Sequence, residues 1–300
     1  MRDAQPSRRG SRRFDDETEQ FQPRGHRRRL EERDDAPADG DRWSTWDQST
    51  AGEHGPDPRP DWLVTELAAV DTELGMLKTG KDADVFLVRR GVPGTDRQCL
   101  LAAKRYRDAE HRMFHRDVGY REGRRVRKSR DNRAMARGSA VGRQMIAAQW
   151  ASAEFGALCS LYEAGVPVPY PAQILGTELL MEFVGDPDGT AAPRLAEVRQ
   201  RGAELTGLWD QLVDALVALA RGGLAHGDLS AYNLLVHGDR LVMIDLPQIV
   251  DVITNPQGAT FLERDATNVA RWFTAHGLTA ADPAPDELPA LLRYEARLDL

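Results

Sequence analysis

The sequence has few cysteines and no long apolar run, and each absence excludes a class of protein. Its two cysteines, Cys99 and Cys159, are too few for a disulfide framework or a zinc cluster. No stretch reaches the roughly 18 uninterrupted apolar residues that a membrane-spanning helix needs. The N-terminus is rich in Arg and Asp and lacks the apolar core of a secretory signal. The sequence therefore predicts a protein of the reducing cytoplasm with no membrane partner.

Branched aliphatic residues are scarce at the start of the chain. Residues 1–60 contain no Val or Ile and a single Leu, Leu30, among many Arg, Asp, Gly and Pro. Such a segment has too little apolar surface to offset the entropy that ordering costs. We therefore predict a disordered tail over 1–60. Its arginines alternate with acids, which favours a solvated tail over a nucleic-acid contact.

The net charge of −7 conceals one strongly basic segment. Residues 105–143 carry thirteen Arg and Lys against five Asp and Glu, whereas 1–60 carry twelve basic and fourteen acidic side chains. A one-sided basic segment is typical of contacts with RNA or a ribosomal particle, because Arg clusters neutralise backbone phosphates. A solvated insertion explains the composition equally well, so both interpretations stay open.

Beyond the tail, the apolar pattern changes from strand-like to helix-like, which indicates an α+β protein with two lobes. The predicted strands are 83–88, 99–104, 178–184, 233–236 and 241–245. The predicted helices are 145–163, about twenty residues around 205–217, and segments near 272–273 and 289–298. A Gly- and Asp-rich cluster at 185–189 is the expected hinge. It would separate a small β-rich N-lobe (61–184, with the basic insertion 105–143) from a helical C-lobe (185–300).

Polar residues at fixed offsets follow the long amphipathic helix. Asp228 lies in a polar loop, Asn233 follows five residues later, and Asp245 ends an apolar strand. Phosphoryl transfer needs a carboxylate that accepts the proton of the attacking hydroxyl, and oxygen ligands that hold Mg²⁺ against the nucleotide phosphates. An H-x-D-x-x-x-x-N loop before a strand ending in Asp is the protein-kinase arrangement, and His226 completes it here. The spacing predicts ATP-dependent phosphotransfer with Mg²⁺.

Two charges upstream lie on otherwise apolar elements. Lys104 ends a short strand, and Glu154 interrupts the apolar face of the 145–163 helix. An acid on a core-facing position is costly unless it is paired, so we predict that Glu154 pairs with Lys104. The segment before the first strand holds one glycine, Gly80, instead of the three of a glycine-rich loop. Lys81 or the backbone near Gly80 is a candidate phosphate contact, with a simple turn as the alternative.

Over roughly 74–273 the sequence resembles the RIO kinases, and within them the RIO1 type. The motifs that carry the resemblance are TGKDADVF at 79–86, AAKRY at 102–106, EAGVPVPYP at 163–171, LLMEFVG at 179–185, HGDLSAYNLLV at 226–236, MIDLPQIVD at 243–251 and FLERDATNVARWF at 261–273. HGDLS-x-YN together with ID-x-x-Q is highly specific. The Gly of DFG and an APE segment are missing, which matches that family.

The resemblance implies a role for each catalytic candidate. Asp228 would accept the proton, and Asn233 and Asp245 would bind Mg²⁺. Lys104 would contact the ATP phosphates while Glu154 holds it. The family is also thought to work as an ATPase that passes phosphate to the metal-binding Asp, here Asp245. The implied activity is that of an atypical serine/threonine protein kinase, acting on an unidentified protein or on itself.

The resemblance also implies an adenine site at the end of the 178–184 strand. Met181 would be the gatekeeper, and the backbone at Glu182 and Val184 would meet the adenine. Two positions depart from the family pattern. Asp82 replaces a usual Glu, a mild change, and Pro247 inside ID-x-x-Q is unusual and would stiffen the segment after the strand.

Two other functions stay open. Small-molecule phosphotransferases of the aminoglycoside or choline kinase type share the HGD loop and the later Asp, but LPQ at 246–248 argues against them. An RNA- or ribosome-associated factor that uses the kinase fold as an ATP-driven switch is favoured by the basic segment 105–143. That second function is compatible with catalysis.

Overall fold

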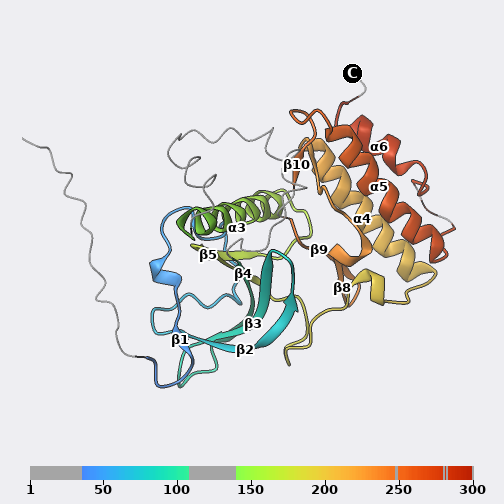
Figure 1. Ribbon diagram of the computed structural model, residues 1–300. Coiled ribbons are helices and arrows are strands. Elements are labelled where there is room, and N and C mark those ends of the chain that lie inside the picture. The colour runs from blue at the N-terminus through green and yellow to red at the C-terminus, as the bar shows by residue number, and fades with distance from the viewer. Residues whose placement is uncertain (1–35, 108–139, 247–248, 280, 282, 299–300) are drawn as a thin grey trace, which may run out of the picture. The chain divides into compact units, whose positions relative to one another are not determined.

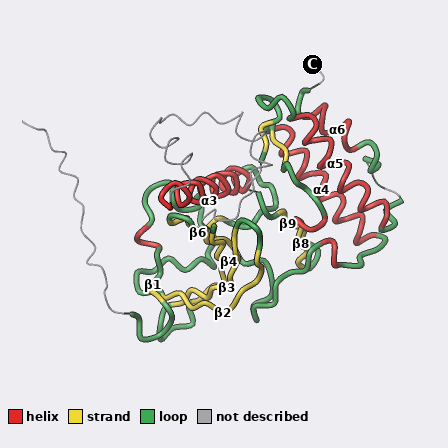
Figure 2. Tube along the Cα trace, viewed as in Figure 1, coloured by secondary structure: helices red, strands yellow, loops and turns green. Residues whose placement is uncertain are grey.

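The computed structural model describes residues 36–107, 140–246, 249–279, 281 and 283–298 (Figure 1). Within these residues, an antiparallel sheet and one long helix form the N-lobe, and a group of helices forms the C-lobe, as the colours of Figure 2 show. This is the α+β, two-lobed, kinase-like fold that the sequence predicts. No helix among the described residues is both long enough and apolar enough to cross a membrane.

The sheet of the N-lobe has the strand order β1-β2-β3-β4-β6-β5, and every neighbouring pair is antiparallel. Its strands are β1 (Arg42–Trp43), β2 (Val70–Thr79), β3 (Ala83–Gly91), β4 (Gln98–Tyr106), β5 (Pro171–Leu175) and β6 (Glu178–Glu182). The predicted pairing of 83–88 with 99–104 is confirmed by the β3–β4 ladder. Sequence patterning missed β2, because two register shifts interrupt its alternation.

The two faces of the sheet pack against different partners. Alternate residues of a strand point to opposite faces, so Tyr106 of β4 joins one core cluster and Leu101 of the same strand joins another. Helix α3 (Ala140–Glu163) covers the Tyr106 face, with Phe155 and Leu158 buried one turn apart. The helix predicted over 145–163 is thereby confirmed. The Leu101 face packs against the segment between β1 and β2, which contributes Trp46, Leu63 and Val64 to that core.

Residues 36–60, which we call the N-terminal strap, are ordered against the sheet. Disorder was therefore a wrong prediction for 36–60, while 1–35 lie outside the described residues. Within the strap, β1 pairs with β2 at one edge of the sheet, and His54 bridges to Gln173 of β5 at the other edge. Trp46, in the short 3-10 helix η1 (Trp46–Gln48), is 7% exposed and joins the Leu101 core. The prediction of disorder was based on the scarcity of aliphatic residues, whereas a buried tryptophan and buried hydrogen bonds anchor this segment.

A buried polar network connects the strap to the sheet. Arg90 is fully buried and donates through Nε and Nη2 to both oxygens of Asp71, at 2.7 and 3.0 Å. Its Nη1 donates to Oε1 of Gln173 at 2.8 Å, and Gln173 in turn donates to Oγ1 of Thr45 at 2.8 Å. A buried charge is tolerated only when it is paired and hydrogen-bonded. The fixed geometry of Asp71, Arg90 and Gln173 thus holds the strap at Thr45.

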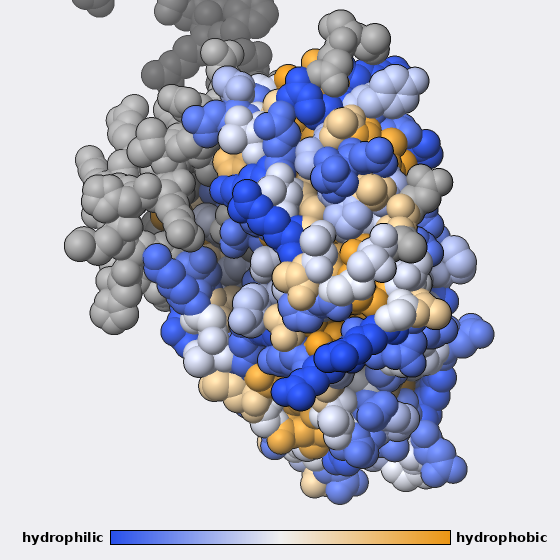
Figure 3. All heavy atoms as spheres, turned by 90° about the vertical axis from the view of Figure 1, so that its right-hand side faces the viewer, coloured by the Kyte–Doolittle hydropathy of each residue, from blue (hydrophilic) through white to orange (hydrophobic). Residues whose placement is uncertain are grey.

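The C-lobe consists of three helices side by side, with short strand pairs beside them (Figure 1). The helices are α4 (Ala203–Arg221), α5 (Gly258–Ala275) and α6 (Leu288–Glu295). The remaining elements are η2 (Leu195–Glu197), β7 (Leu224–Ala225), η3 (Ala231–Asn233), β8 (Leu234–His237), β9 (Arg240–Met243) and β10 (Val250–Asp251). The predicted amphipathic helix is α4, and the predicted strand pair is the β8–β9 hairpin. On the face in Figure 3, described hydrophobic residues form small separate patches among hydrophilic ones.

Candidate active site

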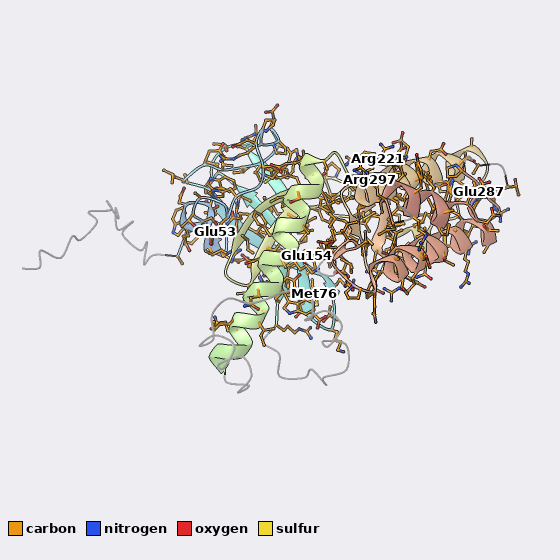
Figure 4. The ribbon with its side chains drawn as sticks, turned by 90° about the horizontal axis from the view of Figure 1, so that it is seen from above. Glu53, Met76, Glu154, Arg221, Glu287 and Arg297 are labelled. Carbon is orange, nitrogen blue, oxygen red and sulfur yellow. The ribbon has the colours of Figure 1, made fainter. Side chains whose placement is uncertain are left out.

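Lys104 and Glu154 form a buried ion pair, as the sequence predicts. Nζ of Lys104 on β4 lies 2.7 Å from Oε1 of Glu154, whose side chain is only 2% exposed. Glu154 lies on α3, where Figure 4 labels it. Burial by itself lowers the pKa of the Lys104 ammonium, but the charges of Glu154 and Asp245 outweigh it and raise the pKa above its ordinary value. Lys104 is therefore held as a cation.

Glu154 connects three parts of the molecule. Its Oε1 accepts from the Leu246 backbone N–H at 3.2 Å as well as from Lys104, and its Oε2 accepts from the Tyr106 hydroxyl. Burial, followed by the charge of Glu154, raises the pKa of the Tyr106 hydroxyl, which therefore stays protonated and donates. One carboxylate thus fixes β4, α3 and the segment that follows Asp245 relative to one another.

The ammonium groups of two lysines contact the Asp245 carboxylate. Its Oδ1 lies 2.8 Å from Nζ of Lys104, and its Oδ2 lies 3.7 Å from Nζ of Lys78 on β2. Burial alone raises the pKa of the Asp245 carboxyl, but the charge and hydrogen bond of Lys104, assisted by Lys78, hold it below its ordinary value. The backbone of Asp245 has φ = 67°, a conformation that costs free energy in a residue other than glycine and is frequent at functional sites.

Asp228 and Asn233 lie in the loop between β7 and β8. The Asp228 side chain is exposed, so a substrate hydroxyl can reach it. Nδ2 of Asn233 donates to the Asp228 carbonyl at 2.8 Å, which leaves the Asn233 side-chain oxygen as an acceptor. The Ile244 N–H donates to the Asn233 carbonyl at 2.9 Å. Asn233 is therefore fixed beside the residue that precedes Asp245.

Asp265 was missed by the sequence analysis and holds the loop that contains Asp228. It lies on α5, is 2% exposed, and accepts from the N–H groups of Gly227 and Leu229 at 2.6 and 3.0 Å. These two residues flank Asp228. Burial raises the pKa of the Asp265 carboxyl, against the effect of those two backbone hydrogen bonds. A sequence signal existed, because an acid on the buried face of an amphipathic helix needs partners, as Glu154 does.

Gly80 and Lys81 lie in the turn that joins β2 to β3. The Gly80 N–H donates to the Ala83 carbonyl at 2.9 Å, and a Cβ on Gly80 would lie 2.9 Å from that oxygen. Glycine is therefore required by this close approach. The Lys81 side chain is exposed, whereas Lys78, three residues earlier, is the lysine that contacts Asp245. Lys78 was not among the residues predicted from the sequence.

The predicted adenine-site residues lie at the end of β6, next to β4. Met181 is partly buried and pairs with Ala102 of β4, two positions before Lys104. The Glu182 N–H donates to the Tyr170 carbonyl at 2.8 Å, and the Val184 carbonyl accepts from the Ala192 N–H at 3.0 Å. The Glu182 N–H and the Val184 carbonyl are therefore both engaged within the protein.

The donor set at the site suits Mg²⁺. Among the described residues, no three His, Cys, Asp or Glu side chains gather as a metal cluster. Asn233 has its amide nitrogen engaged and its oxygen available, and the Asp245 carboxylate lies beside two lysine ammonium groups. One amide and one carboxylate oxygen are the hard ligands that Mg²⁺ takes from a protein while phosphate oxygens and water complete its octahedron. Asn233 and Asp245 therefore fit the ion.

The sequence matches proteins of one family. The sequence model of the RIO domain matches residues 100–285. The chain is 36% identical over 211 residues to the RIO-type serine/threonine-protein kinase Rio1 of Haloferax volcanii, covering 70% of this chain and 66% of that protein. It is 34% identical over 148 residues to Rio1 of Thermoplasma acidophilum, covering 49% of this chain and 74% of that protein. It spans 42% of serine/threonine-protein kinase RIO1 of Caenorhabditis elegans, at 32% identity over 232 residues.

A solved structure is also similar. The crystal structure of the Rio2 kinase from Chaetomium thermophilum aligns with a TM-score of 0.48 and 20% sequence identity, covering 73% of this chain and 63% of that one.

Proposed function

The chain belongs to the RIO domain family, and on this premise we propose that it is an ATP-dependent phosphotransferase, acting as an atypical serine/threonine protein kinase or as an ATPase. One observation carries the proposal. Lys104, Glu154 and Asp245 come from a strand, a helix and a loop far apart in the sequence, and they meet as one charged cluster. Positioned charges are the main source of catalysis in phosphoryl transfer.

Each catalytic side chain would have a distinct task. Lys104 would bind the ATP phosphates, and Glu154 would keep its ammonium pointing at them. Asn233 and Asp245 would hold Mg²⁺, and bound Mg²⁺ would neutralise negative charge on the phosphates. Asp228 would orient the attacking hydroxyl and accept its proton. Its exposed side chain and the Asp265 hydrogen bonds on both sides of it support this role.

Asp245 would also be the phosphoryl acceptor when the protein works as an ATPase. One of its carboxylate oxygens would form the bond to the terminal phosphorus of ATP, ADP would leave, and water would later release the phosphate. Ionisation supports this assignment, because the pKa of Asp245, which burial alone raises, is held below its ordinary value by Lys104 and Lys78. For the adenine, Met181 would be the gatekeeper beside Glu182 and Val184.

Nucleotide binding that depends on Mg²⁺ tests the proposal. ATP with Mg²⁺ at about 100 times its Kd should stabilise the fold by about 2.7 kcal/mol, which raises Tm by about 5–10 °C. Asp245→Asn removes a charge at constant size, so it should lose most of the part of the shift that requires Mg²⁺. Asp239→Asn, at an exposed turn between β8 and β9, is the matched control and should keep the full shift. An undiminished Mg²⁺-dependent shift in Asp245→Asn would sink the assignment.

Several further expectations stay proposals. RNA or a ribosomal particle as a partner depends on the basic segment 105–143, most of which lies outside the described residues. The LPQ segment at 246–248 argues against a small-molecule substrate. Two of its residues, Pro247 and Gln248, also lie outside the described residues. A reducing cytoplasm is supported by two free cysteines, Cys99 and Cys159. We also propose the lobe boundary after residue 184, because β6 ends at Glu182 and α4, the first of the three C-lobe helices, begins at Ala203.

A further inference from the structure

Lys78 lies in register with Lys104 across the sheet. Lys78 of β2 pairs with Val85 of β3, and Val85 pairs with Lys104 of β4. Residues directly opposite one another on neighbouring strands project from the same face. The two lysines therefore stand in one row on the face that carries the active site, and both reach Asp245, Lys104 at Oδ1 and Lys78 at Oδ2.

A bulge in β2 is what turns Lys78 toward this face. Met76, labelled in Figure 4, pairs with Phe86, whereas Lys78 pairs with Val85, so Leu77 is the extra residue on β2. In a regular strand, Met76 and Lys78 would point the same way because they are two positions apart. Phe86 packs with the core on the strap side of the sheet. Without the bulge Lys78 would face that side, away from Asp245; bulges commonly re-aim side chains next to active sites.

Lys104, Glu154 and Asp245 together carry one net negative charge, and Lys78 neutralises it. Glu154 is buried and satisfies Lys104, and Asp245 is shared between Lys104 and Lys78. Lys78 is partly exposed, at 39%, whereas Lys104 is enclosed at 11%, so Lys78 is the lysine that can leave Asp245 at little cost. An ammonium on a flexible stem, next to a carboxylate that prefers a harder cation, is free to move to a phosphate oxygen.

We propose that Lys78 binds the terminal phosphoryl group of ATP, as a second cation beside Lys104. This inference rests on the proposed phosphotransfer function and adds to it a residue that the phosphate-binding set predicted from the sequence did not contain. Lys104 is restrained by its ion pair with Glu154, whereas Lys78, which lies next to the β2–β3 turn, contacts the other oxygen of Asp245. The two lysines would therefore bind different phosphates of ATP, and Lys78 would bind the terminal one.

A comparison of ATP and ADP affinities tests this inference, because ADP lacks the terminal phosphate. Kd would be measured for both nucleotides with Mg²⁺ by calorimetry on the full chain. Lys78→Gln should weaken ATP binding about tenfold, or about 1.4 kcal/mol, and leave ADP binding within about twofold. Lys78→Arg should recover most of the loss, since it restores the charge. Arg89→Gln, which removes one exposed positive charge from β3, is the control and should change neither affinity.

Other outcomes overturn the inference. A lysine that only neutralises Asp245 would leave ATP affinity unchanged in Lys78→Gln or would tighten it. Equal weakening of ATP and ADP would place Lys78 away from the terminal phosphate. If the wild type binds ATP with Mg²⁺ but Lys78→Gln changes the ATP and ADP affinities equally or not at all, the assignment of Lys78 fails and the phosphotransfer proposal survives. If the wild type binds neither nucleotide, both proposals fail.

Discussion

Replacing Tyr106 with Phe should loosen Glu154 without opening a cavity. Tyr106 is 5% exposed, and its hydroxyl donates to Oε2 of Glu154, while Oε1 accepts from Lys104 and from the Leu246 N–H. The substitution removes a single oxygen atom and keeps the ring in the core. Its effect therefore isolates the hydrogen bond that holds the far oxygen of the buried carboxylate.

The expected magnitude follows from the charge of the acceptor. A hydrogen bond to a charged group contributes about 1.5–3 kcal/mol, more than one between neutral groups. Lys104 still pairs with Glu154 in the variant, so we expect the free energy of unfolding to fall by about 2 kcal/mol. Glu154 is then less constrained and positions Lys104 less well. A loss of about 1.4 kcal/mol in transition-state stabilisation would lower the phosphotransfer rate about tenfold.

Urea denaturation and ATP turnover would be measured side by side, with Tyr170→Phe as the matched control. Tyr170 is fully buried in the same lobe, and its hydroxyl donates to the neutral Pro56 carbonyl at 2.9 Å. Its core lies on the strap side of the sheet, away from Glu154. Tyr170→Phe should cost about 1 kcal/mol of stability and leave turnover unchanged.

Equal behaviour of the two variants would refute the reasoning. If Tyr106→Phe loses no more stability than Tyr170→Phe and keeps full turnover, the Tyr106 hydroxyl does not restrain Glu154 in solution. A large loss of stability with full turnover would also contradict it, because the position of Lys104 would then be independent of Glu154.

Two further predictions concern the strap and the charge of Asp245. Trp46→Ala should lower the free energy of unfolding by about 3–5 kcal/mol, because Trp46 is 7% exposed. Trp62→Ala, at a tryptophan that is 36% exposed, should lower it clearly less. Denaturant titration measures both losses, and equal losses would argue against a docked strap. Burial alone raises the pKa of Asp245, but Lys104 and Lys78 hold it below its ordinary value. The ionised carboxylate therefore stabilises the fold above the unfolded-state pKa of about 3.9, and this contribution is lost as the pH falls through the folded-state pKa. The difference in unfolding free energy between wild type and Asp245→Asn, both without nucleotide, should shrink as the pH falls from 7 to 3, and a constant difference would contradict it.

The sequence alone determined the parts of the site that depend on short-range spacing or on the cost of a buried charge. The offsets among His226, Asp228 and Asn233 span one loop, so they can be recognised without knowing what packs around it. The pairing of Lys104 with Glu154 was also predictable, because each charge lies on an apolar element and needs a partner. In the structure, Asn233 donates to the Asp228 carbonyl within that loop, and Lys104 pairs with Glu154.

Only the tertiary structure decided which distant residues complete the site. The bulge at Leu77 shifts the register of β2 and turns Lys78 toward Asp245, and a register shift leaves no regular pattern in a single strand. Asp265 supports a loop 36 to 38 residues earlier in the chain, from Leu229 back to Gly227. The strap is ordered because Trp46 finds a core formed by the sheet. Local composition describes what a segment can bury by itself, whereas folding depends on the surface that the rest of the chain presents to it.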